Sequence, residues 1–278
     1  MDKIQPSLRD SIADTSLLTL YARATEAQNI RPLLHDDLAI KLVEQLDYDF
    51  SIFQYAHTTA VGVALRSIHF DQITRDFIES HQEPIIVIIG CGLDTRKHRL
   101  GEVSDKAIFY QLDLPEVITL RTKLLPPEFN EHYIPCDMLK SNWKDQLLER
   151  HPEGDFLFII EGVLMYLTGR ENQQFFHQLA ERFKGAEVHF DMFNDWMSQH
   201  TYLHEGVSKT KATFKFGLND EKQIQNWHDD LRHEQTWLLS DNPDWYRMGF
   251  PFVSSYLMSY TIRTAIKFLK FTINKSAS

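Results

Sequence analysis

The sequence is poor in the residues that mark several classes of protein. Only two of its 278 residues are cysteines, Cys91 and Cys136, which are too few for a disulfide scaffold. The most apolar short runs, Ile85–Ile89 and Phe156–Ile160, fall far below the roughly 20 residues that span a bilayer. No basic segment followed by an apolar one opens the chain. We therefore predict a soluble protein of the reducing cytoplasm with no membrane segment.

Basic residues are also in short supply. The chain has 29 Lys and Arg against 39 Asp and Glu, which gives a net charge of −10 and a pI near 5.7. A surface of this sign repels polyanions, so we predict no nucleic-acid partner. Glycine is scarce at 11 residues, and the few that occur are expected at special backbone positions. Apolar residues make up 43% of the chain, which excludes wholesale disorder.

The pattern of apolar residues predicts an α/β protein. Helical spacing predicts three N-terminal helices, at Ser11–Gln28, Asp36–Leu46 and Thr58–Ser80. From position 83, short β-rich runs alternate with helical segments, as in a parallel sheet with crossover helices. The predicted strands are Ile85–Ile89, Ile108–Leu112, Tyr133–Cys136, Phe156–Ile160 and Glu187–Asp191.

The second half of the chain carries clear boundaries for one helix and weaker ones elsewhere. Thr168 and Glu171 form a T-x-x-E capping box, and Gly185 lies just past the predicted end of that helix. Beyond Phe193 we predict helices at Trp196–His204, Asp220–Leu231 and Pro251–Ala265, and strands at Thr236–Leu239 and Phe268–Ile273.

No linker or repeat divides the chain, so we predict one domain over residues 1–278. Its expected parts are a helical N-terminal cap, a cofactor-binding core, a lid insertion and a C-terminal segment of strands and a helix. They span residues 1–82, 83–193, 194–235 and 236–278.

The most informative segment is Pro84–Arg96, in which a buried strand leads straight into Gly90-x-Gly92. Such a turn lets the backbone approach a nucleotide-like ligand at the carboxyl edge of a parallel sheet. Asp113 ends the next strand, where a carboxylate can accept hydrogen bonds from the two hydroxyls of a ribose. The third glycine of a dinucleotide motif is replaced by Thr95, and no phosphate-binding loop is present. The cofactor therefore lacks a pyrophosphate, and S-adenosylmethionine fits that description.

Two further acids end predicted strands at the same edge. Asp137 is placed to accept a hydrogen bond from an adenine amine, and Glu161 is placed to face the crevice. The alternative is that each simply caps the segment that follows it.

Four motifs of the chain resemble those of the leucine carboxyl methyltransferase family and occur in the same order as in that family. The resemblance is closer to the bacterial branch, which includes polyketide O-methyltransferases of the tetracenomycin type. It runs from about Thr15 to Phe193 and continues more weakly to the end. The motifs are Ser16–Glu26, Gly90–Arg96, Gln111–Pro115 and Glu161–Leu167.

The resemblance implies a class I S-adenosylmethionine-dependent methyltransferase. Its fold is a Rossmann-like sheet of about seven strands, the last antiparallel, with an N-terminal helical extension and a lid insertion. By motif, Arg66 would pair with the cofactor's carboxylate, or else be a surface helix arginine. Glu161 would lie beside the methionyl group and Tyr166 near the acceptor. The whole implied cofactor site is Arg66, Gly90, Cys91, Gly92, Asp113, Leu114, Asp137, Met138, Glu161 and Gly162.

One departure from the family pattern bears on the acceptor. The lysine used by the eukaryotic members that modify a phosphatase corresponds to Thr19 here. A protein-tail substrate is therefore not expected, and the predicted partner is a small molecule. Tyr21, Arg23 and Trp196 are candidates for the acceptor pocket, although most aromatic residues beyond position 190 are expected in the core.

Other candidates for chemistry are weaker. Cys91 lacks a positioned partner and is expected to be a small buried residue rather than a nucleophile. His200 and His204 have helical i, i+4 spacing, but with no further ligand motif we predict no metal site. Either histidine remains a candidate base in the acceptor pocket.

The identity of the acceptor stays open at this point. A carboxylate is already ionised and needs no base, whereas a phenol with a pKa near 10 benefits from one. The lack of an evident base favours a carboxylate. The alternatives are a phenolic or hydroxyl O-methyltransferase, a non-catalytic cofactor-binding protein, and a nicotinamide-dependent oxidoreductase.

Overall fold

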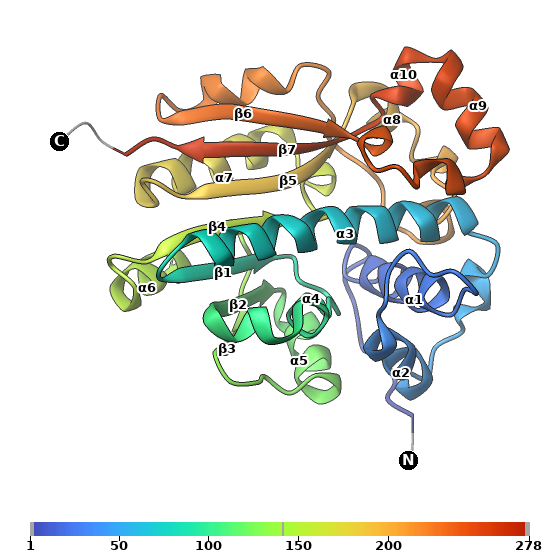
Figure 1. The fold of residues 1–278 in the computed structure, drawn as a ribbon, viewed down its shortest axis with the longest axis horizontal. Coiled ribbons are helices and arrows are strands. Elements are labelled where there is room, and N and C mark those ends of the chain that lie inside the picture. Colours follow the sequence, from blue (N-terminus) through green and yellow to red (C-terminus); the bar gives the residue numbers. More distant parts are fainter. Residues whose placement is uncertain (1–2, 141, 276–278) are drawn as a thin grey trace.

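A seven-stranded sheet forms the centre of the computed structural model, which describes residues 3–140 and 142–275 (Figure 1). The strand order is β3-β2-β1-β4-β5-β7-β6, and β7 alone runs opposite to the other six strands. Strands β1 to β3 are added toward one edge of the sheet and β4 onward toward the other, so the strand order reverses between β1 and β4. Open α/β sheets bind ligands at such a point. The strands are β1 (Pro84–Ile89), β2 (Ile108–Asp113), β3 (Glu131–Pro135), β4 (Asp155–Ile160), β5 (Glu187–Phe193), β6 (Leu231–Leu238) and β7 (Ile266–Ile273).

Strand β1 shows why the sheet is buried on both faces. All six of its residues are buried, and its β-branched side chains point alternately to two apolar clusters. Val87 packs in the cluster that contains α6 (Asn142–Arg150) and α7 (Gly169–Arg182). Ile86 and Ile88 pack in the cluster that contains α3 (His57–Ser80).

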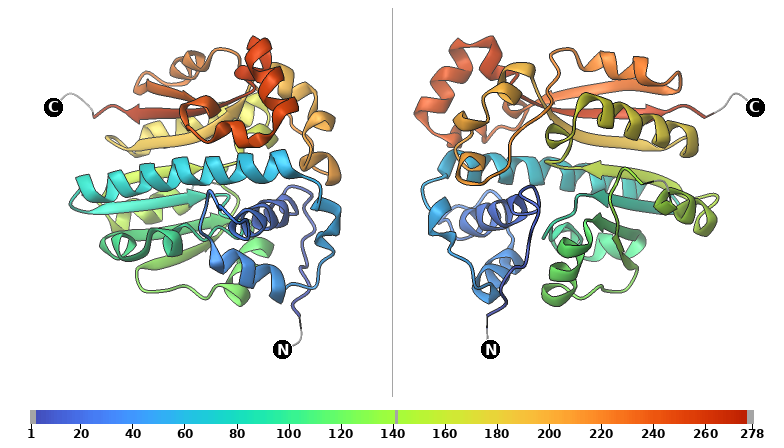
Figure 2. Two further views of the ribbon diagram at one scale, coloured as in Figure 1. Left: turned by 45° about the vertical axis from the view of Figure 1, so that its right-hand side comes forward. Right: turned by 180° about the vertical axis from the view of Figure 1, so that it is seen from behind.

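The helices make two layers around the sheet and one group at its edge. Helix α3 crosses one face, and α7 covers the other face when the molecule is seen from behind (Figures 1 and 2). Helices α1 (Thr15–Ala27) and α2 (Asp37–Gln45) share a third apolar cluster beside the carboxyl ends of the strands. The remaining helices are α4 (Arg96–Leu100), α5 (Pro115–Leu124), α8 (Asp195–Gln199), α9 (Phe250–Met258) and α10 (Tyr260–Arg263).

The predicted sheet is confirmed, including its antiparallel strand, and the first five strands lie within a few residues of their predicted bounds. The capping box is also confirmed, because Thr168 and Glu171 bond reciprocally at the start of α7. The first helix begins four residues later than predicted. Asp10 instead forms a turn, in which its Oδ1 accepts the N–H of Ile12 at 2.7 Å.

Four predicted elements in the C-terminal half differ from the structure. Residues Glu221–Trp227 form a 3₁₀ helix, and β6 begins at Leu231, so the predicted helix Asp220–Leu231 is not α-helical and the predicted strand begins earlier. Helix α8 ends at Gln199, well before the predicted end at His204. The helix predicted at Pro251–Ala265 is broken at Ser259, whose extended backbone and side chain cap α10.

The division into parts stays a prediction, but two features of the fold bear on it. Helix α3 lies in the region expected as an N-terminal cap, yet it packs against the sheet as an integral layer. Strand β6 starts inside the segment 194–235 that was expected as a lid. Within residues 3–140 and 142–275, no helix is long and apolar enough to cross a membrane.

Thr168→Ala tests the capping box. The change removes the acceptor for the N–H of Glu171, so the free energy of unfolding should fall by about 1 kcal/mol. Urea denaturation measures this value. Thr119→Ala is the matched control, because Thr119 bonds only to its own helix, and it should leave stability unchanged or slightly raised. A loss of the same size in both variants would contradict the capping role.

Candidate active site

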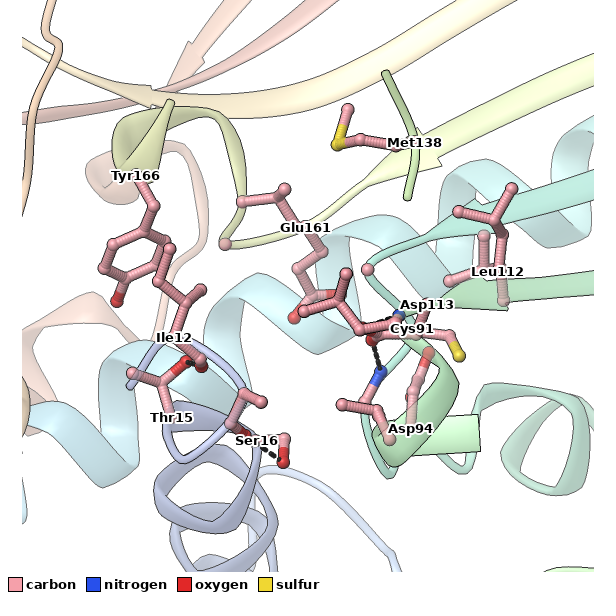
Figure 3. Close-up of a pocket in the computed structure, with 18 of the residues that line it drawn as sticks. Ile12, Thr15, Ser16, Cys91, Asp94, Leu112, Asp113, Met138, Glu161 and Tyr166 are labelled. Carbon is pink, nitrogen blue, oxygen red and sulfur yellow. Dashed lines mark hydrogen bonds between the residues drawn. The ribbon is translucent and has the colours of Figure 1, made fainter. Parts of the chain in front are cut away.

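A cavity of about 310 Å³ lies at the carboxyl ends of β1, β2 and β4. The loops after these strands form its floor, and N-terminal residues from Asp10 to Arg23 close it from the other side. Figure 3 shows Tyr166, Ile12 and Thr15 on one side of Glu161, and Asp113 on the other. We call these two sides the Tyr166 half and the Asp113 half.

The glycine loop after β1 is held close to both neighbouring strands. The backbone N–H groups of Gly90 and Cys91 donate to the carbonyl of Leu112 in β2, at 2.8 and 3.1 Å. Gly90 has a φ of +68°, and a Cβ there would lie 2.3 Å from Cγ2 of Val163. No other residue fits this position, and the loop therefore presents bare backbone to the cavity.

Asp113 is the best-defined acid in the cavity. Its carboxylate accepts the N–H of Gly92 and the N–H of Leu114, each at 2.7 Å, which fixes its orientation across the loop. Burial raises the pKa of Asp113 to about 6, against the opposing effect of these two hydrogen bonds. The carboxylate has acceptor capacity left for ligand hydroxyls.

Asp137 and Met138 follow β3 and line the same half of the cavity. Asp137 Oδ1 accepts the N–H of Leu139 at 2.9 Å, so the capping role considered from the sequence is real. The carbonyl of Met138 accepts from Trp143 Nε1 and Lys144 Nζ, both at 3.1 Å. These bonds hold the loop in place, and Asp137 both caps it and faces the cavity.

Glu161, at the end of β4, lies between two arginines. Its Oε1 accepts from Arg66 Nε at 2.9 Å, and its Oε2 accepts from Arg96 Nη2 at 2.5 Å. Burial opposes ionisation, but the two guanidinium groups outweigh it and hold the pKa of Glu161 below its usual value. Arg66 is therefore not a surface arginine, and Glu161 is a carboxylate fixed at the middle of the cavity.

Several residues that the sequence analysis did not select complete this ion network. Asp191, fully buried in β5, pairs with Arg66 at 3.2 Å, and Arg96 also pairs with Asp71 and Asp94. Asp191 ends the fifth predicted strand, so the rule that selected Glu161 would also have selected it. Arg96 closes the Gly90–Arg96 motif, although its partners come from distant segments that sequence spacing does not reveal.

Arg23 lines the cavity, but its donors are already engaged. Its Nε donates to Asp36 at 3.0 Å, and its Nη2 donates to the carbonyl of Leu93 at 2.7 Å. Arg23 thus fastens α1 to the glycine loop. Thr19 lies beside it in the lining.

Tyr166 lines the half of the cavity away from Asp113, and its role near the acceptor stays a prediction. Its ring packs 5.5 Å from that of Phe214, which brings the segment after β5 over the site. Burial raises the pKa of Tyr166 well above its usual value, so its phenol stays protonated.

The structure places four predicted residues outside the cavity lining. Tyr21 stacks on Phe50 at 5.3 Å, in the cluster between the N-terminal helices. Trp196 stacks on His200 at 4.6 Å, and the Nδ1 of His200 lies 2.6 Å from the carbonyl of Trp196. His204 Nδ1 accepts the N–H of Val207 at 3.1 Å. A pocket role for these residues stays a prediction, and because α8 ends at Gln199, His200 and His204 do not share the face of one helix as expected.

Two further kinds of chemistry considered from the sequence concern the thiol of Cys91 and metal binding. Cys91 is buried, and burial raises the pKa of its thiol, so it is a protonated lining residue and not a nucleophile. No group of three or more His, Cys, Asp or Glu side chains in the described part of the chain is arranged to hold a metal ion.

Comparison with known proteins agrees with this geometry. The model of the leucine carboxyl methyltransferase family matches residues 16–180. Tetracenomycin polyketide synthesis O-methyltransferase TcmP of Streptomyces glaucescens is 27% identical over 232 residues, which cover 84% of each chain. The S-adenosyl-L-methionine-dependent methyltransferase dpfgK of Gibberella zeae is 23% identical and covers 82% of this chain and 83% of that one.

Solved structures show the same fold at low sequence identity. A putative methyltransferase from Thermobifida fusca YX superposes with a TM-score of 0.58 at 14% identity, covering 91% of this chain and 94% of that chain. The strand order, the antiparallel β7 and the cavity at the switch point define the class I methyltransferase fold. Within that class, the chain belongs to the leucine carboxyl methyltransferase family, as the four motifs predicted.

The pKa of Asp113 leads to a testable pH dependence. A protonated carboxyl cannot accept from two ribose hydroxyls, so affinity for S-adenosylhomocysteine should be highest above pH 7 and fall as the pH drops through about 6. Calorimetric titrations between pH 5 and 8 measure it. Asp113→Asn should bind more weakly at every pH and lose this dependence, whereas Asp145→Asn, on exposed α6, should retain it. An unchanged profile in Asp113→Asn would remove the ribose assignment.

Proposed function

We propose that this protein transfers a methyl group from S-adenosylmethionine to an oxygen of a small molecule, with a carboxylate as the acceptor. Family membership supports methyl transfer, and the likeness to TcmP, whose name describes an O-methyltransferase of polyketide synthesis, supports oxygen as the acceptor atom. The nicotinamide-dependent alternative is set aside because the family is one of methyltransferases.

The lining residues fit the cofactor part by part. The bare backbone at Gly90 leaves room for the methionyl chain, and Asp113 has acceptors for the ribose. Asp137 and Met138 lie where the adenine would stack and bond. Arg66 would bind the cofactor's carboxylate. When bound, the cofactor supplies an electrophilic methyl group on a positively charged sulfonium.

The charge of the cavity suits a cofactor of that kind. Its lining holds two arginines, Arg23 and Arg66, and both are already paired with carboxylates. The lining acids outnumber them, so the cavity is negative overall and attracts a sulfonium cation. These acids are Asp10, Asp94, Asp113, Asp137, Glu161 and Glu171.

The observation that favours a carboxylate acceptor is the lack of a nitrogen base in the cavity lining. Neither histidine nor lysine occurs among the residues that line the cavity in the described part of the chain. Burial and the charge of Arg66 lower the pKa of His204 to about 4, which makes it a poor base for a phenol. An acceptor that arrives already ionised needs no such group.

One observation favours the phenolic alternative. No unpaired cation among the described lining residues is available to hold a carboxylate, and the excess of acids repels one. A neutral hydroxyl meets no such repulsion. Under the carboxylate proposal, the sulfonium itself must supply the attraction.

The protein's own contribution to the transfer is alignment and exclusion of water. The acceptor oxygen must lie in line with the methyl group at about 3 Å. Tyr166, Ile12 and Thr15 would define that position, because they line the half away from Asp113. Phe214, packed on Tyr166, covers this half.

An aromatic acid that also bears a hydroxyl group separates the two acceptors in one reaction. The purified protein, deuterated S-adenosylmethionine and a panel of hydroxybenzoic and hydroxynaphthoic acids are incubated together. The isomeric products are separated by liquid chromatography and identified by their fragments in mass spectrometry. We expect labelled methyl esters. Labelled methyl ethers would favour the phenolic alternative. Binding of S-adenosylhomocysteine with neither product would favour a non-catalytic cofactor-binding protein.

His204→Gln tests for a base on the acceptor that the panel identifies. For a carboxylate acceptor, kcat should stay within about twofold of the wild-type value, because no proton is removed. Tyr166→Phe is the comparison, since it changes a side chain in the lining and should raise KM for the acceptor. A hundredfold fall of kcat in His204→Gln, well within the range of general-base effects, would refute transfer to a carboxylate.

A further inference from the structure

Arg66 is the cation that an anionic ligand group would contact at the methionyl end of the cavity. Its side chain is 12% exposed and lines the cavity. Nε donates to Glu161 at 2.9 Å, and Nη1 donates to Asp191 at 3.2 Å. Within residues 3–140 and 142–275, no hydrogen bond or ion pair uses its Nη2. The orientation of the guanidinium group therefore determines where this unused donor points.

Asp191 lies outside the cavity and bonds to two separate parts of the site. It is fully buried and does not line the cavity. Its Oδ1 accepts the N–H of Gly162, in the loop after β4, at 2.6 Å. Its Oδ2 accepts from Arg66, on helix α3. One carboxylate on β5 thus fixes both the loop and the guanidinium group.

The two acids that contact Arg66 differ in how many other side chains they bond. Glu161 is shared with Arg96, which itself pairs with Asp71 and Asp94. Asp191 makes its one ion pair within the described residues with Arg66. Asp191 is therefore the dedicated partner of this guanidinium group.

Gly162 makes the fit around the guanidinium group tight. It has a φ of +70°, and a Cβ there would lie 2.9 Å from Nη1 and 3.0 Å from Nη2 of Arg66. The absence of a side chain lets the guanidinium lie against the backbone that Asp191 holds. Stability alone does not explain such a buried pair, because apolar residues of similar volume often serve the fold as well.

We propose that Asp191 is a positioning residue, which holds Arg66 in the orientation that directs its Nη2 edge to the carboxylate of the cofactor's amino acid. This inference rests on the proposed function, since it needs a cofactor with that carboxylate. Asp191 touches no ligand and acts only through Arg66. It therefore affects ligands that carry the amino-acid group and not those that lack it.

Calorimetric titration with two ligands tests this role. S-Adenosylhomocysteine carries the amino-acid carboxylate, and 5′-methylthioadenosine lacks the amino-acid group. Asp191→Asn keeps the acceptor for the N–H of Gly162 but removes the charge. We expect it to weaken S-adenosylhomocysteine about tenfold or more and to leave methylthioadenosine unchanged. Equal losses for both ligands, or no loss for either, would overturn the proposal.

Two controls make the outcome decisive. Glu187→Gln changes an acid at the other end of the same strand, where it pairs with Lys270, and should alter neither affinity. Circular dichroism verifies the fold of each variant. If Asp191→Asn does not fold, Gly162→Ala places a methyl group against Nη1 and Nη2 of the same guanidinium group, and the same selective loss is expected.

The wild-type protein separates this proposal from the function on which it rests. If it binds neither ligand, the cofactor site is wrong and the role of Asp191 falls with it. If it binds both with equal affinity, the cofactor site is supported. Arg66 then adds no affinity through the carboxylate, and the role of Asp191 is refuted.

Discussion

The arrangement of the site depends on opposite charges buried together at the carboxyl ends of β4 and β5. Arg66 and Arg96 come from two helices, and Glu161 and Asp191 come from two neighbouring strands. Removing one member of such a group leaves an unpaired charge in a low-dielectric environment, which costs about 3–5 kcal/mol. These ion pairs therefore stabilise one another, and they fix the positions of the two strand ends relative to α3 and α4.

The order of the strands in the sheet positions this ion network beside the cavity. Strand order reverses between β1 and β4, so the loops after these strands diverge and leave room for a ligand. The hydrogen bonds from the glycine loop to β2 keep that room open at one end, and Asp113 faces into it. The result is a cavity with a fixed floor and an excess of negative charge. A positively charged methyl donor is suited to both features.

The Tyr166 half is built differently. Its walls come from the N-terminal segment with α1 and from the loop after β4, and Phe214, in the segment after β5, packs against Tyr166. Arg23 ties α1 to the glycine loop, so the covering helices and the cofactor site are joined by buried hydrogen bonds. Apolar side chains and the protonated phenol of Tyr166 line part of this half.

The sequence by itself determined the strands of the core, the capping box of α7 and the acids at strand ends, because each depends on local pattern: alternation, spacing or an end residue. It also determined which residues line the Asp113 half, since the carboxyl ends of parallel strands meet at one edge. The strand-end rule also points to Asp191, but only the tertiary structure showed that Asp191 and Arg96 belong to the ion network. It alone showed that Tyr21, Trp196, His200 and His204 lie outside the cavity lining. Asp191 and Arg96 bond to residues that are tens of positions away in the chain, and such contacts leave no periodic pattern in the sequence.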